Sequence, residues 1–471
     1  MKILRCGEIV EATEGILLYG SSEQEIMRIS TDSRSVQPGS LFVPIKGERF
    51  DGHNFIKDAL AAGAAGTLTQ YDLQELKCCP EHEGSFDGKL IIKVNDTLKA
   101  LRDIAAYYRQ MFRIPFTGIT GSVGKTSTKD MIACVLEQEY NVLKTMGNFN
   151  NEIGVPLTIF NLNDSYEAAV VEMGMSGFGE ISRLTSIVKP KIAVITNIGM
   201  SHMEKLGSRQ NILKAKMEIF EGLPRDGLVV MNGDDTFLYG LKGFLNFRTL
   251  YYGMDEGLDY QAYNVQSAGE TGIYFDINVK NVEYKVHVPV PGIHNVYNAL
   301  AAIAVGVESG ISMKNIIQGI RNFIPGKMRL NIVKNNGIKV INDAYNASPQ
   351  SIDAALKVLI DLEDVNRRIA VLGDVLELGE WARQAHLDIG KLAFNMGIDY
   401  IITVGENGRY IAEGALESGA SVKNVNHFSD NKEVTRFLED FITDGDAILV
   451  KGSRGMKMEE IVEQLIRGEN A

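Results

Sequence analysis

The sequence predicts an α/β protein built from about three domains. With 471 residues, the chain is too long for a single hydrophobic core. Apolar runs typical of β-strands alternate with helical patterns, which indicates parallel sheets with crossover helices. One strand-to-helix junction, residues 117–127, is rich in glycine and carries a lysine, as phosphate-binding loops do.

The first predicted domain covers residues 1–113 and is expected to be a small α/β unit. Its strand candidates are residues 40–45 and 90–94, its helix candidates are residues 55–62 and 97–112, and residues 79–89 form a polar surface loop.

The central domain, residues 114–325, begins with the glycine-rich junction. Apolar runs at 168–171 and 192–195 are expected to continue its parallel sheet, a strand-rich stretch covers 249–290, and residues 291–298 open an alanine-rich helix. This order of elements is typical of a P-loop ATPase-like domain.

The last domain, residues 326–471, is predicted to be a second doubly wound, Rossmann-like unit. Its strand candidates are 339–341, 369–372, 400–404 and 447–450. Polar turns follow three of them, at 342–349, 373–379 and 451–455. Each turn has an alternative interpretation as ordinary capping chemistry, but three such turns on one sheet edge indicate a second ligand-binding wall.

The composition excludes several classes of function. A net charge of −12 argues against non-specific binding to nucleic acid or to an anionic membrane. The four cysteines, Cys6, Cys78, Cys79 and Cys134, contain no C-x-x-C spacing, so neither a disulfide framework nor a zinc site is expected. With no apolar run long enough to span a bilayer, we expect a cytoplasmic protein.

The glycine-rich junction predicts binding of a nucleoside triphosphate. Its glycines allow backbone N–H groups to face a phosphate, Lys125 adds positive charge, and the Thr126 hydroxyl is a ligand for Mg²⁺. The loop departs from the general G-x-x-x-x-G-K-[ST] pattern because Ile119 stands at its first glycine. The alternative, a glycine turn with a solvated lysine, is less consistent with the strand before it and the helix after it.

Three further side chains are candidates for this site. Glu172 ends a strand run beside the loop and would hold Mg²⁺, and His202 follows the next strand, where a metal or phosphate contact competes with a structural role. Lys216 lies on the apolar stripe of a helix over 209–220. From the pattern alone a snorkelling lysine is favoured there; a buried neutral amine could instead react with CO₂ to form a carbamate.

Taken together, these motifs resemble the Mur ligase family of ATP-dependent amide ligases over the whole chain. That family has T-G-[ST]-x-G-K-T-[ST] at the phosphate loop, which explains its irregular start. Residues 145–157, 171–174, 345–349 and 377–379 resemble the branch that joins D-alanyl-D-alanine to UDP-N-acetylmuramoyl-tripeptide. The chain departs from the pattern at Asn342, where an acid is common, and at Val375, where methionine is common.

The resemblance implies a monomer with a uridine-binding first domain, and it implies ATP and two Mg²⁺ ions as cofactors. It places ATP on Gly121, Ser122, Gly124, Lys125, Thr126, Ser127, Asn295, Asn298, Arg329 and Asp343. It places metal on Thr126, Glu172, His202 and a carbamylated Lys216, with Lys125, Lys216 and His202 as catalytic residues. It places the UDP-sugar on Ser33, Arg34, Gly47, Asn148 and Asn151, and the dipeptide on Tyr345, Asn346 and Ser348. From the residues alone, however, the segment around Ser33 and Arg34 is better interpreted as a turn.

Three alternatives remain open. A sister ligase that adds a diamino acid carries an Asp-Asn-Pro-Arg motif, which this sequence lacks. Folate-type ligases lack the uridine-binding domain. A nucleotide-dependent switch without ligase activity would leave the polar turns around Asp343 and Arg454 unexplained.

Overall fold

The structure is a computed structural model that describes residues 1–47, 50–76, 86 and 88–466. Over these residues the strands form three main sheets, each built from one successive stretch of the chain. Helices and mostly parallel strands alternate in all three stretches, which confirms the predicted α/β class. Most of the predicted loop at 79–89, like Cys78 and Cys79, lies outside the described residues.

The first sheet has the strand order β2-β7-β6-β5-β4, and β2 is antiparallel to β7. Its strands are β2 (Ile16–Tyr19), β4 (Arg28–Ser30), β5 (Ser40–Phe42), β6 (Gly66–Thr69) and β7 (Leu90–Lys93). Around it lie α1 (Cys6–Thr13), α2 (Ile56–Ala61), α3 (Thr97–Gln110) and the short pair β1 (Leu4–Arg5) and β3 (Glu25–Ile26). Strand β5 ends earlier than predicted because Pro44 has no N–H with which to continue the ladder. The helix predicted at 55–62 is divided between a 3₁₀ turn, Gly52–Phe55, and α2.

The central sheet has the order β16-β15-β14-β13-β12-β11-β8-β10-β9 and is parallel from β14 to β9. Its strands are β8 (Phe116–Thr120), β9 (Val142–Lys144), β10 (Ala168–Glu172), β11 (Ile192–Ile195), β12 (Leu228–Asn232), β13 (Arg248–Gly253), β14 (Tyr260–Ser267), β15 (Ile273–Val279) and β16 (Val282–Val288). Its helices are α4 (Lys125–Leu136), α5 (Gly154–Ile159), α6 (Glu180–Val188), α7 (Met203–Leu206), α8 (Arg209–Met217), α9 (Thr236–Tyr239), α10 (His294–Glu308) and α11 (Met313–Arg321). Because β8 lies between β11 and β10, the loop that follows it is at the middle of the sheet's carboxyl edge.

The last sheet has the order β17-β18-β22-β19-β20-β21, with only β17 antiparallel to its neighbour. Its strands are β17 (Asn331–Asn335), β18 (Ile338–Asn342), β19 (Arg367–Gly373), β20 (Tyr400–Val404), β21 (Val425–Phe428) and β22 (Asp446–Lys451). Its helices are α12 (Pro349–Ile360), α13 (Ala382–Asn395), α14 (Gly408–Glu417), α15 (Asn431–Phe441) and α16 (Glu459–Ile466). The carboxyl ends of β18 and β22 are adjacent, so the turns that follow them lie together.

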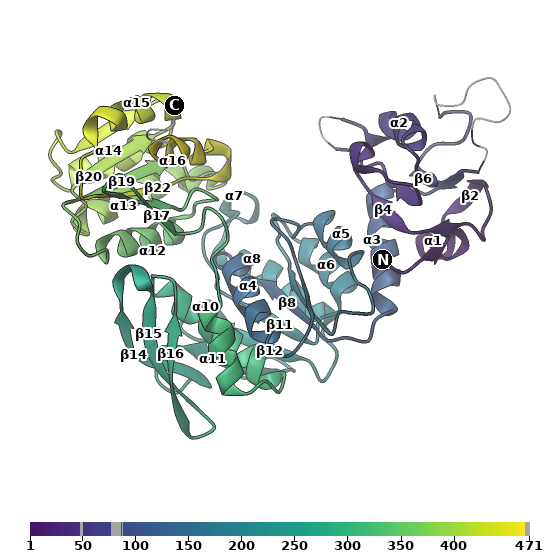
Figure 1. Ribbon diagram of the computed structural model, residues 1–471, viewed down its shortest axis with the longest axis horizontal. Coiled ribbons are helices and arrows are strands. Elements are labelled where there is room, and N and C mark those ends of the chain that lie inside the picture. Colours follow the sequence, from purple (N-terminus) through teal and green to yellow (C-terminus); the bar gives the residue numbers. More distant parts are fainter. Residues whose placement is uncertain (48–49, 77–85, 87, 467–471) are drawn as a thin grey trace.

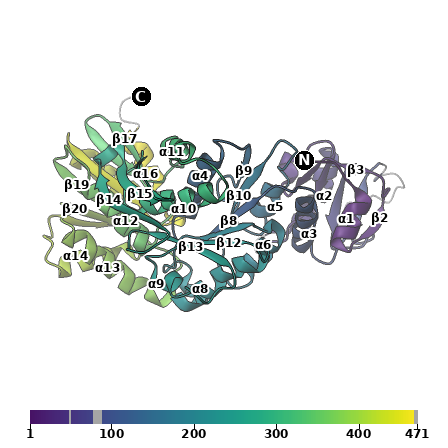
Figure 2. The same ribbon diagram turned by 90° about the horizontal axis from the view of Figure 1, so that it is seen from below.

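The first and last parts of the chain lie at opposite ends of the central part (Figures 1 and 2). One continuous set of buried apolar side chains, from Leu4 to Tyr251, includes the buried face of α3 and joins the first part to the central part. The last part has buried clusters of its own, between Ile338 and Leu465. Among the described residues, no helix is both long enough and apolar enough to cross a membrane.

Candidate active site

The loop between β8 and α4 has a backbone that requires glycine at two positions. A Cβ atom on Gly121 would lie 1.8 Å from Thr196 Oγ1, so no larger residue fits. Gly124 has φ +83° and precedes the first turn of α4, a conformation that side chains disfavour. The loop therefore directs the N-terminus of α4 towards the carboxyl edge of the sheet, where anions bind favourably.

Asn197 fixes the position of this loop from the neighbouring strand end. The backbone N–H of Ser122 donates to Asn197 O at 3.0 Å, and the backbone N–H of Val123 donates to Asn197 Oδ1 at 3.0 Å. The Asn197 amide in turn donates to Val123 O at 2.9 Å. The sequence analysis did not identify this support of the loop.

Lys125 folds back over the loop that precedes it. Its Nζ donates to Gly121 O at 2.8 Å and to Ser122 O at 3.4 Å. Burial lowers the pKa of Lys125, Glu172 opposes that change, and Arg329 adds to it. A phosphate group would therefore meet a lysine that is already positioned by the loop and held near a carboxylate.

Glu172 presents a carboxylate with one free oxygen. The residue ends β10 and is 2% exposed. Its Oε1 accepts a 2.7 Å hydrogen bond from Asn150 Nδ2, and its backbone N–H donates to Thr145 Oγ1 at 3.0 Å. Its Oε2 is buried and has no hydrogen-bond partner among the described residues. An uncompensated carboxylate oxygen of this kind fits a cation.

His202 and Lys216 occupy different environments. His202 has φ +62°, and its Nδ1 lies 2.7 Å from Glu377 Oε2, a carboxylate from the last part of the chain. Hydrogen bonding with His202 lowers the pKa of Glu377. Lys216 is 2% exposed, which excludes a snorkelling side chain. Burial and the nearby charge of Lys125 place the pKa of Lys216 well below its ordinary value.

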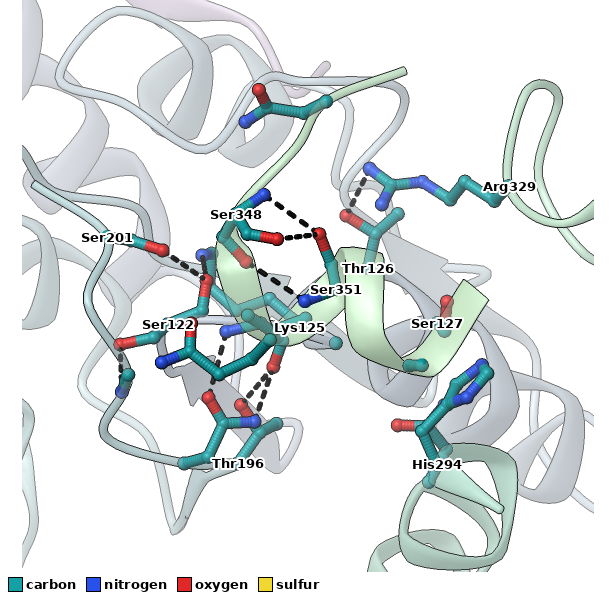
Figure 3. Close-up of a pocket in the computed structure, with 18 of the residues that line it drawn as sticks. Ser122, Lys125, Thr126, Ser127, Thr196, Ser201, His294, Arg329, Ser348 and Ser351 are labelled. Carbon is teal, nitrogen blue, oxygen red and sulfur yellow. Dashed lines mark hydrogen bonds between the residues drawn. The ribbon is translucent and has the colours of Figure 1, made fainter. Parts of the chain in front are cut away.

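The last part of the chain supplies the opposite wall of the site. Arg329 Nη2 donates to Thr126 Oγ1 at 3.0 Å, and its guanidinium lies 4.1 Å above the centre of the Tyr345 ring. Figure 3 shows Arg329 reaching Thr126, and Ser348 and Ser351 at the start of α12 line the same cavity as Lys125. The Ser348 hydroxyl caps α12 by accepting from the Ser351 N–H.

Asp343 is held by Lys451, the first residue of the polar turn predicted at 451–455. Lys451 is buried, and its Nζ lies 2.5 Å from Asp343 Oδ2 and 3.0 Å from Asn346 O. The backbone N–H of Leu330 donates to Asp343 Oδ1. The position of Lys451 at a strand end was a usable signal, because a charged residue at the carboxyl edge of a parallel strand is often a ligand contact.

These walls enclose a cavity of about 980 Å³. Sixteen predicted site residues line it: Ser122, Gly124, Lys125, Thr126, Ser127, Asn148, Asn151, Glu172, His202, Asn295, Asn298, Arg329, Asp343, Tyr345, Asn346 and Ser348. Gly121 and Lys216 are not among its lining residues, although Lys125 contacts the first and influences the second.

The five residues predicted for the UDP-sugar are not brought together. Asn148 and Asn151 line the cavity, whereas Ser33, Arg34 and Gly47 belong to the first part of the chain and do not. Arg34 forms an ion pair with Asp32, whose carboxylate also accepts from the Arg34 N–H in a 3₁₀ turn. That contact lowers the pKa of Asp32 to about 2. The turn interpretation of this segment is therefore confirmed.

Asn295, Asn298 and His294 lie at the start of α10 and line the cavity. Asn298 Nδ2 donates to Asn295 Oδ1 at 2.9 Å, and Asn298 Oδ1 accepts from Thr128 at 2.8 Å, which ties α10 to α4. The Asn295 amide lies 3.2 Å from His294 Nε2. If that amide donates, His294 carries its proton on Nδ1, which is buried and has no partner among the described residues. Sequence reasoning did not identify His294 as a site residue.

His294 is expected to make the folded protein sensitive to acid. Burial and the charge of Lys451 lower its pKa from 6.5 to about 4. Between those values the unfolded chain binds a proton that the folded chain does not, so stability falls as the pH falls from 6.5 to 4 and is unaffected above 6.5. At about 1.4 kcal/mol per tenfold change in proton affinity, the loss is at most about 3 kcal/mol. Denaturation of the protein and of His294→Gln at pH 7.5 and 5 measures it; equal losses in both would contradict the assignment.

Comparison with known proteins places this architecture in one family. The model of the Mur ligase family catalytic domain matches residues 25–109. The Mur ligase middle domain matches residues 119–306, and the Mur ligase glutamate ligase domain matches residues 328–454. UDP-N-acetylmuramoyl-tripeptide--D-alanyl-D-alanine ligase from Bacillus subtilis is 42% identical over 97% of each chain.

Two solved structures have the same fold over nearly the whole chain. The crystal structure of MurF from Acinetobacter baumannii has a TM-score of 0.89 and 30% identity over 99% of both chains. MurF ligase from Thermotoga maritima, solved in complex with ADP, has a TM-score of 0.82 and 26% identity over 93% of this chain and 97% of that one. With similarity extending through all three sheets, the chain belongs to the Mur ligase family.

Proposed function

We propose that this protein is an ATP-dependent amide ligase that joins D-alanyl-D-alanine to UDP-N-acetylmuramoyl-tripeptide and so forms the UDP-linked pentapeptide precursor of peptidoglycan. One observation carries the proposal: the phosphate loop and a buried, incompletely bonded Glu172 face a second wall from the last sheet across one cavity. The curated relative from Bacillus subtilis bears the name of this activity, and the relative from Thermotoga maritima was solved with ADP.

The reaction requires activation of a carboxylate. The γ-phosphoryl group of ATP passes to the terminal carboxylate of the tripeptide, with ADP as the leaving group. The amine of the dipeptide then attacks the acyl phosphate, loses a proton, and displaces inorganic phosphate. No side-chain nucleophile is needed, so the residues of the chain act by positioning and by charge: Lys125 and the N–H groups of the loop neutralise phosphate oxygens, and Arg329 approaches from the opposite wall.

The donor set of the cavity fits Mg²⁺. Thr126, Glu172 and His202 all line it, and Glu172 Oε2 has no hydrogen-bond partner among the described residues. No group of three His, Cys, Asp or Glu side chains in the described part of the chain could hold a metal by itself, and Mg²⁺ ordinarily completes its shell with phosphate oxygens and water. When bound, the metal neutralises negative charge on the phosphates. Two ions, shared by these residues, are proposed.

The remaining assignments follow the same scheme. The first domain, residues 1–113, would bind the uridine end through Ser33, Arg34 and Gly47, while Asn148 and Asn151 in domain 114–325 would meet the sugar side of that substrate. In domain 326–471, Asp343 would contact the ribose of ATP, and Tyr345, Asn346 and Ser348 would meet the incoming dipeptide. The aromatic face of Tyr345 is already covered by Arg329, which supports a role for this pair at the wall between nucleotide and dipeptide.

Phosphate release tests the function. We expect release from ATP and Mg²⁺ only when UDP-N-acetylmuramoyl-tripeptide and D-alanyl-D-alanine are both present, together with a product heavier by the dipeptide. Release without the amine would favour a nucleotide switch. Release with a diamino acid and UDP-muramoyl dipeptide would favour the sister ligase.

Lys216 is proposed to be carbamylated. The burial of Lys216 and its lowered pKa favour the neutral amine, which can attack CO₂, form a C–N bond and lose one proton to water. Removing CO₂ and bicarbonate from the buffer is expected to lower turnover by about 10–100-fold, the range seen when a group that orients a metal ligand is lost. Added bicarbonate should restore it. Labelling with ¹³C-bicarbonate should give a carbamate NMR signal that Lys216→Met lacks; the same signal in that variant would contradict the assignment.

A further inference from the structure

Glu377 connects the last part of the chain to the cavity, although it does not line the cavity itself. It lies in the turn that follows β19, and its Oε2 is 2.7 Å from Nδ1 of His202, which follows β11 in the central part. The two residues are far apart in the sequence and belong to different sheets. The predicted polar turn at 373–379 thus reaches the site through a residue of the opposite wall.

The backbone around this contact is closely fitted. The N–H of Glu204 in α7 donates to Glu377 O at 3.3 Å. A Cβ atom on Gly379, which has φ +56°, would lie 3.2 Å from the Glu204 Cα, so the turn and α7 leave little space between them. The contact between His202 and Glu377 is therefore part of a larger contact between two segments and not a chance meeting of two long side chains.

Both partners have backbones that non-glycine residues rarely adopt. His202 has φ +62° and Glu377 has φ +63°. Such conformations cost about 1 kcal/mol each and persist where the surroundings require them, often at functional sites. The Glu377 side chain is 61% exposed and that of His202 is 24% exposed, and a contact to such an exposed carboxylate adds little to stability. The stability that the contact adds is therefore too small to explain why both residues adopt unfavourable backbone conformations.

The contact determines which nitrogen of His202 is available. A carboxylate on Nδ1 holds the ring proton there and leaves Nε2 as the unprotonated nitrogen. Carboxylate–histidine pairs of this kind fix the tautomer and orientation of metal-binding histidines. Since the carboxylate comes from the last part of the chain, the two walls must be in contact for His202 to receive it.

We propose that Glu377 is a positioning residue that prepares His202 for the metal and phosphate side of the cavity and does so only when the last part of the chain contacts the central part. The inference rests on the proposed function for the role of His202. Under this proposal the metal affinity depends on contact between the two walls. His202 has the required orientation and tautomer only when the walls are in contact.

Metal binding tests this without requiring ligation. Mn²⁺ is titrated by electron paramagnetic resonance in the presence of a non-hydrolysable ATP analogue, for the unmodified protein, Glu377→Ala, Glu377→Gln and the control Glu380→Ala, which removes an exposed carboxylate from the same turn. Glu377→Ala is expected to weaken Mn²⁺ binding by about 10–100-fold, as loss of such a supporting carboxylate does elsewhere. Glu377→Gln keeps an acceptor for Nδ1 and should remain close to the unmodified protein, as should Glu380→Ala.

Two further readouts separate positioning from a general defect. Trp381 is the only tryptophan in the sequence and lies in the 3₁₀ turn Gly379–Trp381 beside α7, so its fluorescence reports on this contact in every variant. In turnover assays, Glu377→Ala should raise the Mg²⁺ concentration for half-maximal rate more than it lowers kcat at saturating Mg²⁺. Unchanged Mn²⁺ affinity in Glu377→Ala, or an equal loss in Glu380→Ala, would overturn the proposal. Failure of the unmodified protein to ligate would instead count against the proposed function.

Discussion

Replacing Lys125 with alanine is expected to lower kcat by at least about 10²–10³-fold, the loss that follows removal of one preorganised donor to a developing negative charge. The structure gives the reason: Lys125 lines the cavity at the end of the loop, where its Nζ is held by Gly121 O and Ser122 O. Phosphate release in the presence of both substrates measures the effect. The loss should appear in kcat more than in the KM for the dipeptide, because the charge acts on the transferring phosphoryl group.

The control for this variant is another lysine of the same domain. Lys144 ends β9 and pairs with Glu137 at 3.1 Å, outside the cavity. Lys144→Ala should retain normal turnover, and both variants should keep a folded structure by circular dichroism. Activity close to normal in a folded Lys125→Ala protein would remove the basis for the ligase assignment.

Glu172→Gln is expected to separate activity from stability. The substitution keeps the shape of the side chain and an acceptor for Asn150, but removes a buried charge whose second oxygen has no partner. Burial of a neutral amide costs less than burial of an unpaired charge, so the free energy of unfolding should change by less than about 1 kcal/mol. Turnover should fall by about 10²-fold or more, because a metal held less well neutralises less phosphate charge.

Glu167→Gln is the matched control, because Glu167 precedes the opposite end of the same strand and is exposed. It should behave as the unmodified protein in both assays. The Mg²⁺ dependence of the rate gives the clearest measurement: Glu172→Gln should need more Mg²⁺ and recover part of its activity. An unchanged Mg²⁺ requirement with normal turnover would show that Glu172 does not hold the metal.

Local features of this site could be predicted from the sequence, whereas contacts between distant segments could not. The loop at 121–124 and the strand-end position of Glu172 follow from a short apolar strand, a glycine-rich turn and a helix, all of which are local. The apolar stripe that carries Lys216 is also a local pattern, but that pattern favoured a snorkelling side chain, so the burial of Lys216 needed the structure.

Other features depend on how the sheets meet. The bond from Arg329 to Thr126 joins residues 203 positions apart, and the pair of Asp343 and Lys451 joins positions 108 apart. No local pattern gives the relative orientation of two sheets, so these contacts needed the structure. The end of strand β5, by contrast, could have been predicted locally. Pro44 lies within the predicted strand, and a proline there indicates that the strand ends before it.

The two junctions of this chain differ in the kind of surface that movement would uncover. Buried apolar side chains run without interruption from the first sheet into the central one, so separating those parts would expose apolar area at roughly 25 cal/mol per Å². Across the second junction, the contacts described above are polar ones, from Arg329 to Thr126 and from Glu377 to His202, and water replaces such groups at little net cost. Relative movement should therefore be concentrated between the central and last parts. A nucleotide bound to both walls would hold these two parts together until it dissociates.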